Sequence, residues 1–81
     1  EMIINPNPIV NTLSAFFESE KNEQIIIYVS DMNGKILLTQ KATVSQGGSR
    51  VDIPATSLGK GAYIVTTSLN GMRLVKKMVK L

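Results

Sequence analysis

Residues 24–40 read QIIIYVSDMNGKILLTQ, and this stretch decides the fold. Residues 25–29 are all β-branched or aromatic, which is typical of a strand that runs through the middle of a sheet. Ile25, Ile27 and Val29 then share one face of that strand, because successive side chains in a strand alternate sides. We expect the strand to be central, since an edge strand this apolar would pair with other chains and aggregate.

Two Asn-Gly pairs, Asn33-Gly34 and Asn70-Gly71, predict two-residue turns of type I′. Both central positions of such a turn need positive φ, which Asn and Gly tolerate. The predicted hairpins join residues 24–30 to 35–40 and residues 62–69 to 72–80.

Residues 13–20 fit two patterns. Leu13, Phe16 and Phe17 have helical spacing, whereas Leu13, Ala15 and Phe17 have the spacing of one strand face. The short length of the segment and its place between an Asn-Pro turn and a polar loop favour a strand. Residues 2–4 and 50–53 add two short strands, and Gly47-Gly48-Ser49 is interpreted as a turn.

About seven short strands at regular spacing predict an all-β fold, an antiparallel β-sandwich of immunoglobulin-like type. At 81 residues the chain is expected to form one domain, residues 1–81. In the last strand the adjacent charges Lys76 and Lys77 interrupt the alternation, which indicates either a bulge or an exposed edge.

The composition excludes most chemistry. The chain has no His and no Cys, so the commonest general base, thiol nucleophile and metal ligands are missing, and no cofactor is expected. Gly59-Lys60-Gly61 lacks the pattern of a phosphate-binding loop. Only 5% of the residues are aromatic, and Phe17 and Tyr63 are assigned to the core, so a nucleic-acid surface is not indicated. No apolar run approaches the roughly 20 residues of a membrane-spanning helix.

The net charge of +3 comes largely from the tail of the chain, where Arg73, Lys76, Lys77 and Lys80 lie close together. Such a cluster attracts anionic partners, but it is more often a solvated strand face that blocks edge pairing. From the composition alone, both readings stay open.

Four sequence features, in order, resemble the type A C-terminal sorting domain of the type IX secretion system. They are Pro6-Asn7-Pro8, Asp31-Met32-Asn33-Gly34-Lys35, Lys60-Gly61-Ala62-Tyr63-Ile64-Val65, and the ending from Asn70-Gly71 through Lys76-Lys77-Met78-Val79-Lys80. Ala62 stands where that family more often has a larger apolar residue, and Thr67 where it often has Val. These departures concern packing.

The resemblance implies a non-catalytic sorting signal at the C-terminal end of a cargo protein, made in bacteria of the Bacteroidetes group. Its partners would be the N-terminal cargo domains, the outer-membrane type IX translocon and a sortase-like C-terminal peptidase that removes the domain. The cargo would pass through the periplasm and outer membrane and be secreted or held at the cell surface.

The same resemblance implies recognition residues in two motifs. They are Lys60, Gly61 and Tyr63 of the Lys-Gly-x-Tyr motif, and Gly71, Lys76, Lys77 and Lys80 of the last hairpin. The two glycines can simply meet backbone geometry, and the tyrosine can simply fill the core. The lysines could steer a partner or flank a strand that adds to a receptor.

An alternative function is a carbohydrate-binding or adhesive sandwich appended to a secreted enzyme. That function needs an exposed aromatic platform or a concave polar groove, and Tyr28 is the one obvious candidate. A purely structural spacer is a third possibility.

Overall fold

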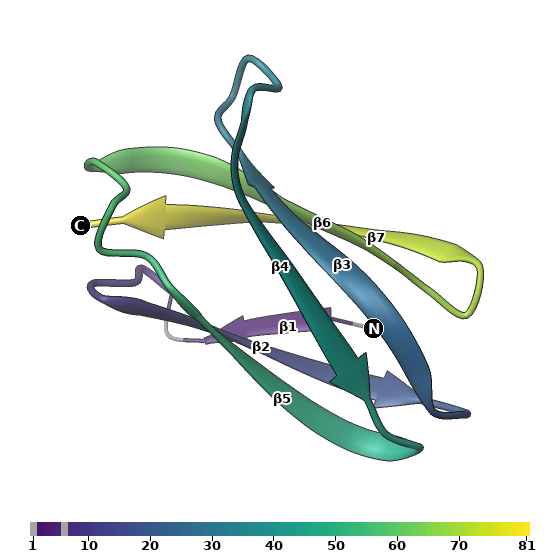
Figure 1. Cartoon of the computed structure of the whole chain (residues 1–81). Helices are drawn as coiled ribbons and strands as arrows, with labels where there is room; N and C mark the ends of the chain where they lie inside the picture. The colour runs from purple at the N-terminus through teal and green to yellow at the C-terminus, as the bar shows by residue number, and fades with distance from the viewer. Residues whose placement is uncertain (1, 6) are drawn as a thin grey trace.

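The computed structural model describes residues 2–5 and 7–81, which form seven β-strands in two antiparallel layers (Figure 1). The strands are β1 (Met2–Asn5), β2 (Thr12–Ser19), β3 (Glu23–Ser30), β4 (Ile36–Val44), β5 (Gly47–Pro54), β6 (Gly61–Leu69) and β7 (Met72–Lys80). One sheet has the order β1-β2-β5 and the other β4-β3-β6-β7. The all-β sandwich is therefore confirmed. No helix in the described part of the chain could cross a membrane.

β3 is a central strand, as predicted, and lies between β4 and β6. Its alternate residues Ile25, Ile27 and Val29 are at most 3% exposed and face the other sheet. β2 is a strand and not a helix, because Leu13, Ala15 and Phe17 alternate into the same core. Burial of this apolar surface is the main favourable term in folding.

The core fills the space between the sheets. The inward face of β6 contributes Tyr63, Val65 and Leu69, and also Thr67, whose hydroxyl donates a 2.8 Å hydrogen bond to the carbonyl of Ile26. In the described residues every fully buried side-chain nitrogen or oxygen has a hydrogen-bond partner. The remaining fully buried side chains come from both sheets and from the loops, and include Met2, Ile9, Val44, Ile53, Ala55 and Met78.

The turn between β6 and β7 has the predicted form. Asn70 has φ of 54° and Gly71 has φ of 75°, so both central residues of this two-residue turn have positive φ. The register runs directly from Leu69 opposite Met72. Both observations match a type I′ hairpin.

The prediction of a two-residue turn at Asn33-Gly34 is wrong. Residues 31–35 all lie outside the strands, and Gly34 has φ of 90° whereas Asn33 has no positive φ. The reason is Asp31, whose carboxylate accepts hydrogen bonds of 2.9 Å from the amides of Asn33 and Lys35. Together with the 3.1 Å bond from the Gly34 amide to the Asp31 carbonyl, this Asx turn replaces the tighter turn.

Two predicted boundaries are also wrong. Gly47-Gly48-Ser49 is part of β5 and not a turn, because its backbone pairs with residues 17–19 of β2. β4 continues past residue 40 to Val44, which is fully buried. The connection between the two strands is short, and the hydroxyl of Ser49 accepts a 2.8 Å hydrogen bond from the Ser45 amide.

The charges at Lys76 and Lys77 mark an edge and not a bulge. β7 is the outer strand of the four-stranded sheet, and its register with β6 runs without a shift from Met72 to Lys80. The shift in this sheet lies elsewhere, between Val29 and Ser30 in the β3–β4 ladder.

Candidate functional site

Most of the predicted recognition residues gather at one end of the β6–β7 hairpin. Gly61 lies opposite Lys80 in the ladder, and Tyr63 lies opposite Met78. Gly71 lies in the turn at the far end, about 30 Å away for a nine-residue strand. The structure therefore does not bring Gly71 together with the others. Pro6, which begins the first of the four features, lies outside the described residues.

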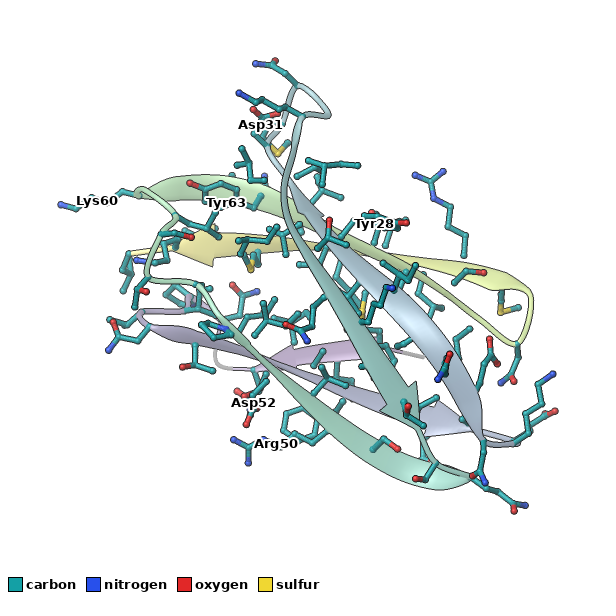
Figure 2. The ribbon with its side chains drawn as sticks, viewed as in Figure 1. Tyr28, Asp31, Arg50, Asp52, Lys60 and Tyr63 are labelled. Carbon is teal, nitrogen blue, oxygen red and sulfur yellow. The ribbon has the colours of Figure 1, made fainter. Side chains whose placement is uncertain are left out.

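Tyr63 belongs to the fold. Its ring is 8% exposed, and its hydroxyl donates a 2.7 Å hydrogen bond to the carbonyl of Gly59 in the β5–β6 connection (Figure 2). A tyrosine near the start of this strand that bonds to the backbone just upstream is the tyrosine corner of immunoglobulin-like sandwiches. Lys60, by contrast, projects from the connection into solvent.

The three lysines of β7 lie on two different faces. Lys76 is opposite Val65, which is fully buried, so Lys76 leaves the strand on the core side. Lys80 leaves on that side too, and its Nζ donates a 3.1 Å hydrogen bond to the carbonyl of Leu81. Lys77 is opposite Ile64 and lies on the outer face. A charge on the core side of an edge strand, as at Lys76, hinders edge-to-edge aggregation.

Arg73 shares the outer face with Lys77, since the two positions differ by an even number of residues. The sequence-based list of recognition residues omitted it. The signal that could have identified it is the period of two: counting back from Lys77 gives Val75 and then Arg73. Both Val75, at 49% exposure, and Arg73 are open to solvent.

The β6–β7 hairpin is positively charged and carries no acidic residue from Gly61 to Lys80. Within residues 2–5 and 7–81, the ion pair at 4.0 Å or less is that of Arg50 and Asp52, at 2.8 Å on the three-stranded sheet (Figure 2). The hydrogen bonds from Arg50 and Ser14 hold the pKa of Asp52 below its usual value. In the described residues no ion pair of 4.0 Å or less neutralises the positive charges of β7.

The described residues contain no group of three acidic side chains that could hold a metal ion. Tyr28 lies on β3 and Phe16 on β2 beneath the Arg50 guanidinium, 5.8 Å from its ring centre. The two aromatic side chains outside the core are therefore on different sheets and form no common platform.

Several open hollows lie on the described surface. One of about 520 Å³ lies where β3 and β6 diverge, and Gln24, Ile26, Ser68 and Arg73 contribute to its lining. The β3–β6 ladder ends at Tyr28 and Thr66, which is why the strands separate there. Most of the residues that line this hollow are polar or charged: besides Gln24, Ser68 and Arg73 they include Glu23, Tyr28, Thr66 and Thr67.

Fold and surface together define a small immunoglobulin-like β-sandwich whose distinctive feature is a basic edge strand. The family model of the secretion system C-terminal sorting domain matches residues 3–81. Because this match spans nearly the whole chain, the chain belongs to that family, the C-terminal sorting domains of type IX secretion. The family is one of sorting signals and not of enzymes. A comparison with curated proteins finds no match.

Proposed function

We propose that residues 1–81 form one sorting domain that directs an attached cargo protein across the outer membrane through the type IX translocon. Family membership supports a sorting role and a cargo that is secreted or displayed at the cell surface. The observation that supports β7 as the recognised element is its edge position: it is an outer strand, basic, solvent-exposed and without acidic neighbours on the hairpin.

The domain itself performs no chemistry in this proposal. A sortase-like peptidase removes it after translocation, and many cargoes are then attached to the cell surface. Lys60, Lys76, Lys77 and Lys80 are the recognition candidates, since no carboxylate of the described residues lies within 4.0 Å of their charged ends. Gly61, Tyr63 and Gly71 support recognition by holding the hairpin in shape.

A reporter fusion tests the proposal. Residues 1–81 are placed behind a signal peptide and a fluorescent protein, in a bacterium that has this secretion system. The variant Lys76→Glu/Lys77→Glu/Lys80→Glu reverses the charge of β7. The matched control Lys21→Glu/Lys35→Glu/Lys41→Glu reverses three exposed lysines elsewhere.

We expect the unmodified fusion and the control to reach the surface or the medium, and the β7 variant to stay in the periplasm as a folded protein. If the unmodified fusion stays in the periplasm, the sorting function is wrong. If all three fusions are exported equally, the domain sorts its cargo but the translocon does not recognise the charge of β7.

A further inference from the structure

The outer edge of β7 is only partly covered by the chain itself. The amide of Ile9 donates a 2.8 Å hydrogen bond to the carbonyl of Val79, and the amide of Leu81 donates one of 2.9 Å to the carbonyl of Ile9. Ile9 thus acts as a short parallel strand against the end of β7. The carbonyl of Val79 therefore points away from β6.

This contact also gives the direction of the other backbone groups. In a strand the N–H and C=O of one residue point to the same side, and successive residues alternate. Arg73, Val75 and Lys77 have the same parity as Val79, so their backbone N–H and C=O groups point away from β6 too. The register with β6 has no shift, so this parity holds along the strand. Residues 73, 75 and 77 therefore present a row of outward donors and acceptors, and within the described residues no backbone hydrogen bond to another segment occupies them.

The other three edge strands each carry a feature that discourages an added strand. β1 has four residues, β4 contains the register shift of its ladder with β3, and β5 ends on Pro54, which has no N–H. Short length, irregular register and proline are the usual protections of sheet edges. β7 has nine residues in regular register. Ile9 covers the end of this strand, and from Arg73 to Lys77 the protective feature is charge.

The positive charge of β7 determines which kind of added strand can pair with it. Arg73 and Lys77 flank Val75 on the outer face, and β6 and β7 contain no acidic residue. A second copy paired antiparallel about Val75 would place Arg73 opposite Lys77 twice, and like charges directly opposite destabilise a strand pair. An extended segment with acidic side chains at those positions would instead form favourable cross-strand pairs.

We propose that residues 73–77 of β7 accept an extended acidic segment of a partner protein as an added strand. Backbone hydrogen bonds hold the segment, and the charges of Arg73 and Lys77 make the site selective for acidic side chains. The inference rests on the proposed function, because the partner is then a component of the secretion machinery.

Single proline substitutions in the same reporter fusion test strand addition. Val75→Pro removes one outward N–H of β7 and places a ring where the added strand would lie, while the β6–β7 ladder keeps its bonds. Thr39→Pro is the matched control on β4. The Thr67 hydroxyl bonds to the Ile26 carbonyl, so the backbone N–H and C=O groups of the even-numbered residues of β3, including Tyr28, point toward β6. Thr39 lies opposite Tyr28 in the β3–β4 ladder. The backbone N–H and C=O of Thr39 therefore point away from β3, toward the open edge of β4. Val75→Thr keeps the N–H and a β-branched side chain.

We expect Val75→Pro to reduce the exported fraction about tenfold or more, and Thr39→Pro and Val75→Thr to export like the unmodified fusion, with all variants folded by circular dichroism. Export of Val75→Pro at the unmodified level would overturn strand addition while the sorting function stands. If the unmodified fusion itself is not exported, the sorting function is wrong.

Charge is tested separately with Arg73→Glu/Lys77→Glu, which should reduce export as strongly as Val75→Pro. Normal export of this double variant would overturn the acidic character of the partner. If the purified domain is dimeric and becomes monomeric on Val75→Pro, a second copy occupies the edge. That result would also overturn the proposal of an acidic partner segment.

Discussion

The hydroxyl of Tyr63 donates a 2.7 Å hydrogen bond to the backbone carbonyl of Gly59, four residues earlier in the chain. The bond ties the β5–β6 connection to the start of β6, and the tyrosine ring is buried beneath it. The Lys-Gly-x-Tyr motif therefore has two parts. Gly61 and Tyr63 shape the connection, and Lys60 is left free at its surface.

Tyr63→Phe removes this hydrogen bond and keeps the ring. We expect the free energy of unfolding to fall by about 1 kcal/mol, the net value of a typical hydrogen bond. Urea denaturation measures the loss, with Tyr28→Phe as the control, since Tyr28 lies on the outer face of its sheet. Secretion of the fusion should persist in Tyr63→Phe as long as the domain folds. An equal loss of stability in Tyr63→Phe and Tyr28→Phe would contradict a stabilising role for the hydrogen bond from Tyr63 to Gly59.

Gly71→Ala tests the β6–β7 turn. Gly71 has φ of 75°, and an added Cβ would meet no atom within 4 Å, so the cost comes from the backbone conformation alone. We expect a loss of about 1 kcal/mol in the free energy of unfolding.

Gly48→Ala is the matched control for Gly71→Ala. Gly48 has no positive φ, and its added Cβ would lie 3.5 Å from Oε1 of Glu18, an ordinary contact. Here we expect no loss, or a small gain from the lower entropy of the unfolded chain. Equal effects of the two substitutions would contradict the assigned turn geometry.

Amide hydrogen exchange should reveal where β3 leaves β6. The amides of Ile25, Ile27 and Val29 point toward β4 and should be strongly protected. The Ile26 amide points toward β6 beyond the last ladder pair, Tyr28 and Thr66. We expect it to exchange about tenfold or more faster than that of Ile27. Equal protection would mean that the two strands stay paired along their whole length.

The Asp52 carboxylate should make stability depend on pH in the acid range. The hydrogen bonds from Arg50 and Ser14 lower its pKa in the folded state below 3.8, so its contribution is present above that value. As pH falls through the lowered pKa, the folded state loses the contribution. Urea denaturation should find Asp52→Asn less stable than the parent near about pH 6, with the difference shrinking as pH falls through the lowered pKa. In an Arg50→Gln background the difference at the higher pH should shrink.

Much of this fold follows from local sequence patterns. The alternation of Ile25, Ile27 and Val29 predicts a buried strand face, and Asn70-Gly71 predicts its turn correctly. Both rest on properties of a few neighbouring residues. The turn at Asn33-Gly34 was mispredicted because Asp31, two residues before the pair, offers the backbone amides a competing acceptor. The glycines at positions 47 and 48 were mispredicted because their pairing partners lie in β2, about 30 residues away in sequence.

Part of the candidate site could likewise be predicted from the sequence, and part could not. By itself the sequence determined that the last strand is basic, and its motifs indicated the family. Only the tertiary structure decided that Lys76 leaves β7 on the core side, that Ile9 pairs with the end of its outer edge, and that the outward backbone groups of residues 73–77 have no backbone partner in the described residues. Strand order and edge exposure depend on backbone pairing between segments far apart in the chain. Local composition and periodicity do not encode which of the possible pairings gives the best-packed core.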